Sequence, residues 1–386
     1  MRVLVIGHKI SKEYLGVPTV LSNLLKGFVK IHSELEKNDI YLTFLSLYDD
    51  INKDLTERIR IKGIKVYKPI TALGDIQFTM MYLKNKDFRD FDVVHSHEIY
   101  GLFPYILKTP TIFTLHAIWW KESMIEKKVY QKFWRKVSEF KLRLLYSKLT
   151  KFTALSRYVL EELKRKNFDI SFKKTIIIEN PVSDEFFNVK KKEEPMILYP
   201  ASLIPRKNQL GFLKAISMIK NELGDYKIVF TTSSRHEYGI KVRKYAENNN
   251  LNVEFLGRVP YQKLPSLYSR AAIVALTSFE EVLPMSIIEA LSTGTPVIAS
   301  NVGGIPYVVQ NGITGFICNP HEPKDIAEKL LILVSDKNTR KKMGRTGRKN
   351  AEKRWKAEII AKKYLDLYLE VANQNSAGHH LINKRP

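Results

Sequence analysis

Short apolar runs alternate with stretches of helical periodicity along the first half of the chain. The runs are rich in β-branched and large apolar residues and predict buried strands at 3–6, 41–47, 66–67, 93–95, 111–115, 152–155 and 175–178. Strands that alternate with helices indicate a parallel sheet with helices on its faces. The pattern therefore predicts a Rossmann-like α/β domain over residues 1–181.

The same alternation starts again after a polar, charged segment at 182–195, which predicts a linker. Further strands are expected at 196–199, 227–231, 253–256, 273–276 and 295–299, before a turn-rich stretch to residue 317. They predict a second doubly wound domain at 196–356, a helix at 357–372 that could pack back on the first domain, and a polar tail at 373–386. Two such domains hold ligands at the carboxyl ends of their strands, so the site is expected in an interdomain cleft.

Charge and cysteine content narrow the environment of the protein. The 386 residues include 63 Lys or Arg and 40 Asp or Glu, a formal charge of +23, which favours a phosphorylated or polyanionic partner or an anionic membrane surface. The single cysteine, Cys318, excludes an intrachain disulfide and fits a reducing compartment. The first residues read as a strand rather than a signal peptide, and no long apolar run predicts a membrane span. We expect a cytoplasmic protein, with the inner face of the membrane as a candidate location.

Candidate chemistry concentrates at residues 278–298, where a strand, a polar loop and a helix start follow one another. Glu281 lies on the loop, Pro284 is placed to open the helix, and Glu289 lies about one and a half turns inside it. Carboxylates suit the hydroxyls of a sugar or a ribose, and the amides of a helix start suit a phosphate. This stretch therefore predicts a site for a phosphorylated polyol.

Two further features of the second half lie on loops that follow strands. Arg206 and Lys207 come after the strand at 196–199, where a pair of cations can neutralise a diphosphate. Gly303 and Gly304 allow a tight backbone turn near a ligand. Either feature alone also fits ordinary surface charge or an ordinary turn, and its position at a strand end favours function.

The first half offers weaker candidates. Gly16 lies between a strand and a helix, where a glycine lets the backbone approach a phosphate, although a plain turn explains it equally well. His97 and His116 come just past two strand ends, whereas His95, inside its strand, is expected to be structural. His97, His116 and Glu98 lack the spacing of a known zinc motif, so no metal site is expected. No dinucleotide or Walker glycine motif is present.

The segment 119–150 predicts a basic amphipathic helix. Apolar residues recur at helical spacing, at positions 125, 129, 133, 137, 140 and 144, and nine Lys or Arg outnumber three Glu. A stripe that faces the core is the common explanation. Four extra aromatic residues, Trp119, Trp120, Tyr130 and Trp134, also permit contact with an anionic bilayer or a lipid-linked acceptor.

Taken together, Glu281, Glu289, Lys207 and the glycine pair at 303–304 resemble the retaining GT-B glycosyltransferases of family four. The spacing of seven residues between Glu281 and Glu289 is the most specific part, within the run from 253 to 317. The resemblance extends more loosely through VLVIG, HSHE, TLHA, ALSRYV and IIENPV in the first half. It implies two Rossmann-like domains and transfer of a sugar from a nucleoside diphosphate to an acceptor hydroxyl, such as a glycan or a lipid-linked saccharide, without a bound metal.

The resemblance also implies roles for individual residues. Lys207 would hold the diphosphate, Glu289 the donor ribose and Glu281 the donor sugar, while His116 would lie near the transferred sugar. The remaining implied donor contacts are Gly16, Arg206, Leu283, Pro284, Met285 and Ser286. The family usually has an arginine where Ser202 stands, so Arg206 is the candidate to replace it in the diphosphate clamp.

Two other functions remain open from the sequence. A sugar-nucleotide epimerase or hydrolase of the same shape would act on the donor without an acceptor. A basic protein that binds nucleic acid would use the charge of +23, although the positive charge is spread along the chain and no such module is present.

Overall fold

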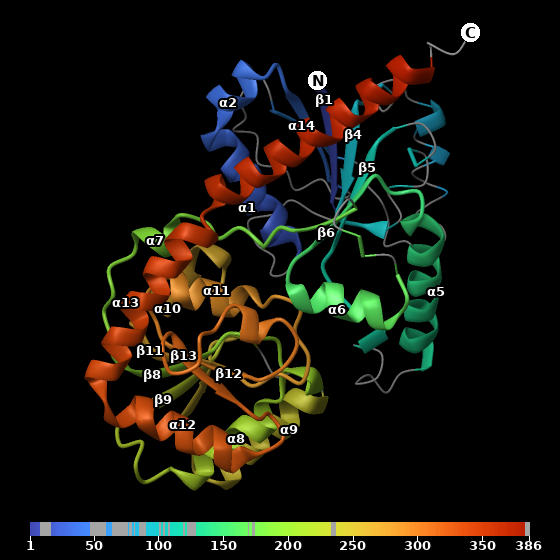
Figure 1. The fold of residues 1–386 in the computed structure, drawn as a ribbon. Coiled ribbons are helices and arrows are strands. Elements are labelled where there is room, and N and C mark those ends of the chain that lie inside the picture. Colours follow the sequence, from blue (N-terminus) through green and yellow to red (C-terminus); the bar gives the residue numbers. More distant parts are fainter. Residues whose placement is uncertain are drawn as a thin grey trace. The chain divides into compact units, whose positions relative to one another are not determined.

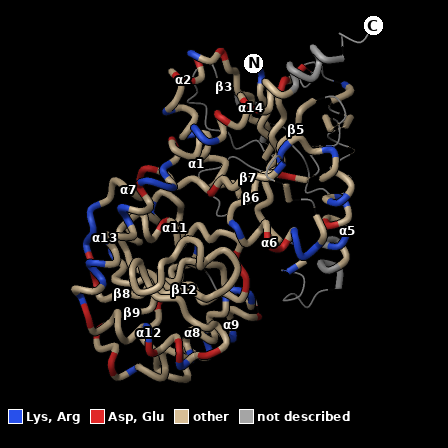
Figure 2. Tube along the Cα trace, in the orientation of Figure 1, with Lys and Arg blue, Asp and Glu red and all other residues tan. Residues whose placement is uncertain are grey.

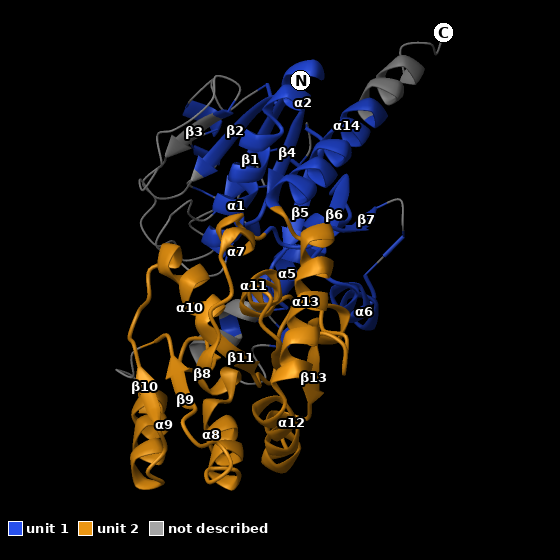
Figure 3. Cartoon of the chain, turned by 90° about the vertical axis from the view of Figure 1, so that its left-hand side faces the viewer, with its two compact units in different colours: residues 1–181, 357–386 blue, residues 182–356 orange. Residues whose placement is uncertain are grey.

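The computed structural model describes residues 1–7, 17–46, 59–63, 76, 79–80, 82–84, 90–99, 102, 105–106, 109–118, 120–121, 129–168, 170–171, 174–232 and 237–382. The chain divides into two compact units, residues 1–181 with 357–386 and residues 182–356 (Figures 1 and 3). Each unit contains its own parallel sheet with helices around it. The predicted α/β class with two doubly wound domains is confirmed.

The sheet of the first unit has the strand order β3-β2-β1-β4-β5-β6-β7. Its strands are β1 (Arg2–Gly7), β2 (Tyr41–Ser46), β3 (Ile59–Gly63), β4 (Val93–Ser96), β5 (Thr111–Leu115), β6 (Lys151–Ala154) and β7 (Thr175–Ile177). All neighbouring pairs are parallel. The strand predicted at 66–67 lies outside the described residues. Because β4 and β5 are neighbours, the residues that follow them meet at one edge of the sheet.

The C-terminal helix belongs to this first unit. The unit's main helices are α1 (Val17–Lys30), α2 (His32–Lys37), α5 (Val129–Tyr146), α6 (Arg157–Arg165) and α14 (Ala357–Ile382). Phe28 of α1 stacks on Tyr368 of α14 with ring centroids 6.1 Å apart. A Cβ at Gly27 would lie 2.2 Å from the carbonyl oxygen of Ala357, so the two helices are in backbone contact. The helix continues to Ile382 through most of the predicted polar tail.

The sheet of the second unit has the order β10-β9-β8-β11-β12-β13. Its strands are β8 (Glu194–Tyr199), β9 (Lys227–Phe230), β10 (Val253–Phe255), β11 (Ala271–Leu276), β12 (Val297–Ser300) and β13 (Gly315–Cys318). Its helices are α7 (Glu185–Asn188), α8 (Gln209–Met218), α9 (Glu237–Asn248), α10 (Leu264–Arg270), α11 (Met285–Ser292), α12 (Pro323–Ser335) and α13 (Lys337–Arg354), with the 3-10 turns η3 (Pro205–Lys207), η4 (Tyr261–Lys263) and η5 (Ile305–Tyr307). The edge strand β13 lies in the stretch that the sequence predicted only as turns.

Residues 182–195, predicted as a linker, are instead part of the second unit. The amide of Val182 donates to the carbonyl of Trp355 at 2.7 Å, and the segment contains α7 and begins β8. Phe186 and Phe187 are buried, and Glu193 pairs with the buried Arg340 at 2.7 Å. The charged composition of the segment hides these anchors, because its polar residues surround two aromatic side chains that the unit's core requires.

Helix α5 exposes part of the predicted apolar stripe. Phe140 and Leu144 are 61% and 59% exposed, whereas Leu142 and Tyr146 are buried. The expectation of a stripe that faces the core is therefore wrong at Phe140 and Leu144, because Leu142 and Tyr146 supply the buried face of this part of the helix. Trp120 is buried in the unit, whereas Trp119 lies outside the described residues and the side chains of Tyr130 and Trp134 are not described. In the described part of the chain, no helix combines the length and the apolar content needed to cross a membrane.

Candidate active site

The loops that follow β8 and β11 meet at one edge of the second sheet. These strands are parallel neighbours, so η3 after β8 and residues 277–284 after β11 leave the sheet on the same side. The amide of Phe279 donates to the carbonyl of Arg206 at 2.8 Å and joins the two loops. Arg206 and Lys207 therefore lie beside the stretch that contains Glu281.

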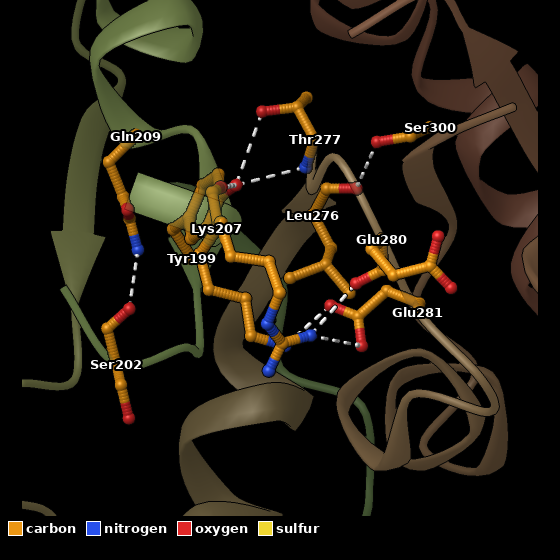
Figure 4. Close-up of polar contacts among 10 residues, drawn as sticks. Tyr199, Ser202, Lys207, Gln209, Leu276, Thr277, Glu280, Glu281 and Ser300 are labelled. Carbon is orange, nitrogen blue, oxygen red and sulfur yellow. Dashed lines mark hydrogen bonds and ion pairs between the residues drawn. The ribbon is translucent and has the colours of Figure 1, made fainter. Parts of the chain in front are cut away.

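The side chains of Lys207 and Arg206 converge on Glu281, and Figure 4 shows Lys207 beside Glu280 and Glu281. The Lys207 ammonium donates to Oε1 of Glu281, and the Arg206 guanidinium lies 3.8 Å from Oε2 and donates to the carbonyl of Glu280 at 2.8 Å. Burial raises the pKa of the Glu281 carboxyl, but the charges of Lys207 and Arg206 outweigh it, and the net pKa lies below its usual value. Glu281 is thus a buried carboxylate held ionised by two cations.

Backbone contacts hold this cluster in place. The Tyr199 hydroxyl accepts from the amide of Thr277 at 2.9 Å and donates to the carbonyl of Lys207, so one buried tyrosine at the end of β8 ties both loops together. On the other side, the amide of Gly304 donates to the carbonyl of Glu281 at 2.8 Å. The glycine pair, which was predicted to lie near a ligand, therefore packs against the backbone of Glu281.

Glu289 lies in a different environment from Glu281. It is buried on α11 and accepts a hydrogen bond from the hydroxyl of Tyr268 at 3.0 Å. Burial raises the pKa of Glu289 to about 7, although hydrogen bonds from Tyr268 and Tyr261 oppose this shift. The pKa values of the two carboxylates are therefore shifted in opposite directions, which lets them interact differently with one ligand.

The start of α11 follows the Glu281 loop. Pro284 is the residue before the first helical turn rather than its first member, and Met285 begins the helix. Leu283 and Pro284 are buried, while Met285 and Ser286 are half-buried. The first amides of a helix have no intrahelical acceptor and point out of its end, so this turn suits an anion next to the cation cluster.

The predicted residues of the first half belong to the other unit. His97 and His116 follow β4 and β5, and Nδ1 of His97 lies 2.7 Å from Nε2 of His116. His95 is buried, and both of its ring nitrogens are hydrogen-bonded, to Tyr368 and to Thr114, which confirms that it is structural. Gly16 lies outside the described residues.

Comparison with known families agrees with this arrangement. Residues 183–350 match the family model described as glycosyl transferases group 1, and residues 29–186 match the model described as glycosyltransferase family 4. The chain belongs to the family-four glycosyltransferases of GT-B fold. The two models together span residues 29–350 and so include parts of both units, and the family assignment does not rest on the Glu281 region alone.

Individual relatives of this glycosyltransferase support the assignment. It is 30% identical over 180 residues to a GDP-mannose-dependent monoacylated alpha-(1-6)-phosphatidylinositol monomannoside mannosyltransferase of Corynebacterium glutamicum. That match covers 45% of this chain and 46% of the relative, so the chain spans about half the length of the relative. 

Solved structures agree in fold. A sucrose-phosphate synthase from Thermosynechococcus elongatus superposes with a TM-score of 0.79 at 17% identity, over 96% of this chain and 99% of that one. Anabaena HepE in complex with UDP and glucose gives a TM-score of 0.71 at 16% identity, over 95% and 99% of the two chains.

Several site residues of this glycosyltransferase were not foreseen from its sequence. Tyr199 and Thr277 fix the two loops, and Tyr268 with Tyr261 holds Glu289. Tyr199 is the last residue of β8, and Thr277 follows the end of β11. Their position at strand ends is the sequence feature that points to them. Tyr261 and Tyr268 lie before β11 and carry no sequence signal, because only the fold brings them to α11.

Proposed function

We propose that this protein transfers a sugar from a nucleoside diphosphate sugar to an acceptor hydroxyl, with retention at the anomeric carbon. The observation that supports this most strongly is the cluster of Lys207, Arg206 and Glu281 beside the start of α11. A diphosphate needs cations and amides, and a sugar needs a carboxylate that accepts from its hydroxyls. The cluster offers all three within one pair of loops.

The reaction would proceed by departure of the diphosphate. When the bond between the anomeric carbon and the β-phosphate oxygen breaks, negative charge grows on that phosphate. Lys207 and Arg206 would turn from Glu281 to this charge, with the amides of Met285 and Ser286 at its other side. Arg206 would then take the role of the arginine that the family usually has at the position of Ser202. No step of this account requires a metal.

The two glutamates would orient the donor. Once Lys207 engages the phosphate, the carboxylate of Glu281 is available to the hydroxyls of the sugar, while Glu289 accepts from those of the ribose. Residues 283–286 would contribute backbone contacts, and His116 and Gly16 stay predicted contacts of the donor. The acceptor hydroxyl would bond to the anomeric carbon and pass its proton to the departing phosphate.

A saccharide or a lipid-linked saccharide is the proposed acceptor class. The mannosyltransferase relative bears the name of a phosphatidylinositol mannoside acceptor, and HepE was solved with UDP and glucose. The outer face of α5 supports a peripheral position on an anionic membrane, because exposed Phe140 and Leu144 lie on the same helix as exposed Lys136. Figure 2 shows that, in the described parts of both units, Lys and Arg are dispersed rather than gathered along one track that a nucleic acid could follow.

Thermal unfolding with a panel of nucleoside diphosphate sugars tests the proposal. A true donor raises the melting temperature in proportion to the logarithm of its concentration over its dissociation constant, and Lys207→Ala should lose most of this shift. The stabilising donor is then incubated with saccharide acceptors, and the configuration of the product is read by NMR. Conversion of the donor without any acceptor would favour the epimerase or hydrolase, and a panel with no shift would contradict the donor site.

A further inference from the structure

His97 and His116 form a hydrogen-bonded pair at the edge of the first sheet. Their rings lie 5.0 Å apart and 25° from parallel, and the bond joins Nδ1 of His97 to Nε2 of His116. His97 is buried, whereas His116 is only half-buried. One member of the pair can therefore reach a ligand, and the other can act only through it.

His95 and helix α14 hold His97 from behind. The His95 ring lies 4.3 Å from that of His97 and is fixed by hydrogen bonds of 2.8 Å to the Tyr368 hydroxyl and 2.7 Å to that of Thr114. Tyr364 packs against His95 at 4.9 Å. This support keeps the ring of His97, and with it the direction of its bond to His116, in one orientation.

The protons of the pair are linked. Burial lowers the pKa of His116 to about 4 and that of His97 well below its usual value, where the nearby histidines add to the effect. Each ring is therefore neutral at neutral pH and carries one proton. Only one proton can lie in the bond between them. If His97 donates, both rings are protonated at Nδ1; if His116 donates, both are protonated at Nε2.

The far nitrogen of His97 decides between the two arrangements. Its Nε2 is buried and has no hydrogen-bond partner among the residues that the structure describes. A proton there would leave a buried N–H group unpaired, which folded proteins tolerate less often than an unpaired acceptor. The proton is therefore placed on Nδ1 of His97, which donates to Nε2 of His116.

We propose that His97 is a positioning residue that holds His116 in the Nδ1–H tautomer, so that His116 presents an N–H donor to an oxygen of its ligand. In the described part of the chain, Nδ1 of His116 has no hydrogen-bond partner of its own. The tautomer follows from the first unit alone. That the accepting oxygen belongs to a sugar donor rests on the proposed function.

NMR of the ligand-free protein with isotope-labelled histidine tests the tautomer directly. Long-range proton–nitrogen correlations distinguish Nδ1–H from Nε2–H, and His116→Gln identifies the signals of His116 by their loss. We expect His116 to be protonated at Nδ1 at neutral pH. Protonation at Nε2 would overturn the proposal, whether or not the protein transfers a sugar.

Two variants of His97 separate positioning from packing. His97→Leu fills the space without a donor, so His116 should move away from the Nδ1–H form. His97→Asn keeps an amide N–H near the position of Nδ1 and should preserve it. With an identified donor, His97→Leu should lower kcat about tenfold, the effect of one lost hydrogen bond, with an unchanged donor KM. An unchanged His116 tautomer in folded His97→Leu would contradict the role; should that variant not fold, the wild-type and Asn spectra still decide.

Discussion

Gly303 touches the backbone of Glu281 so closely that no other residue fits there. A Cβ at Gly303 would lie 1.8 Å from the carbonyl oxygen of Glu281, and its φ of +55° is one that side chains rarely adopt. The turn after β12 and the loop after β11 are therefore packed backbone against backbone. The position of Glu281 depends on a residue that has no side chain.

Gly303→Ala should displace the Glu281 loop and abolish the donor-induced rise in melting temperature. It should also lower the free energy of unfolding by about 2–3 kcal/mol, since the clash is with backbone and the φ is strained. Gly312→Ala is the matched control, because its φ is +77° but a Cβ there meets open space. Its cost should be about 1 kcal/mol, with donor binding unchanged. Equal effects of the two variants would show that only the φ matters.

Lys207→Ala should weaken nucleoside diphosphate binding at least about tenfold, because it removes a charge-assisted contact to the phosphates. It should also destabilise the protein by about 2 kcal/mol, since buried Glu281 loses one of the two cations that pair with it and keeps Arg206. Calorimetric titration and denaturant unfolding measure the two effects. Adding Glu281→Gln should restore stability but not binding, which separates them.

Lys227→Ala is the control for that substitution. Lys227 pairs with Glu254 at 2.9 Å, but both side chains are nearly half exposed. An exposed pair of this kind contributes little, so stability and binding should both remain near the wild-type values. If Lys227→Ala weakened the binding of the nucleoside diphosphate as strongly as Lys207→Ala does, the ligand would be attracted by general surface charge rather than by the Lys207 cluster.

The sequence was sufficient for most of the strands and for the residues at their ends, although β3 and β13 were not predicted as strands. Strand runs and the Glu281–Glu289 spacing are local patterns, and they led directly to Lys207, Arg206 and the glycine pair. Partners that join across the fold could not be predicted in this way. Tyr268 meets Glu289, and Tyr368 meets His95 from a helix 273 residues further along the chain, only because the chain returns there.

Errors in the prediction had physical causes as well. The segment 182–195 was predicted to be an exposed linker but contains buried residues. The apolar stripe of α5 was predicted to be buried but is exposed at Phe140. Phe186 and Phe187 are buried within a charged segment, and Phe140 is exposed on an apolar stripe. Periodicity gives the spacing of a face but not the direction in which it points, because that depends on what packs against the helix.

The raised pKa of Glu289 predicts a dependence of stability on pH. In the unfolded chain the carboxyl loses its proton near its usual value of 4.5, but in the folded protein it does so near 7. Between these two pH values the folded state holds one more proton than the unfolded state. The protonated carboxyl of Glu289 therefore stabilises the fold at low pH, and this stabilisation is lost as pH rises through about 7. A pKa shift of this size corresponds to a change of roughly 3 kcal/mol in the free energy of unfolding.

Glu289→Gln mimics the protonated carboxyl and should remove this dependence. Its melting temperature relative to the wild type should therefore rise from about pH 5 to about pH 8. The same variant should bind the donor more weakly at high pH, where ionised Glu289 accepts from ribose hydroxyls. A constant difference in melting temperature across this range would show that Glu289 ionises normally in the folded protein.

The outer face of α5 predicts a preference for anionic vesicles. Phe140 and Leu144 would insert at the level of the headgroups while nearby lysines meet anionic phosphates, so binding should fall with salt and be weak on zwitterionic vesicles. Phe140→Ser combined with Leu144→Ser should reduce sedimentation with anionic vesicles several-fold, roughly the loss of two partly buried apolar side chains. Ile332→Ser on α12 is the control, because Ile332 is likewise an exposed apolar residue, at 45%, but lies on the second unit. If both variants sedimented like the wild type, the charge of +23 alone would account for binding, and α5 would have no special role.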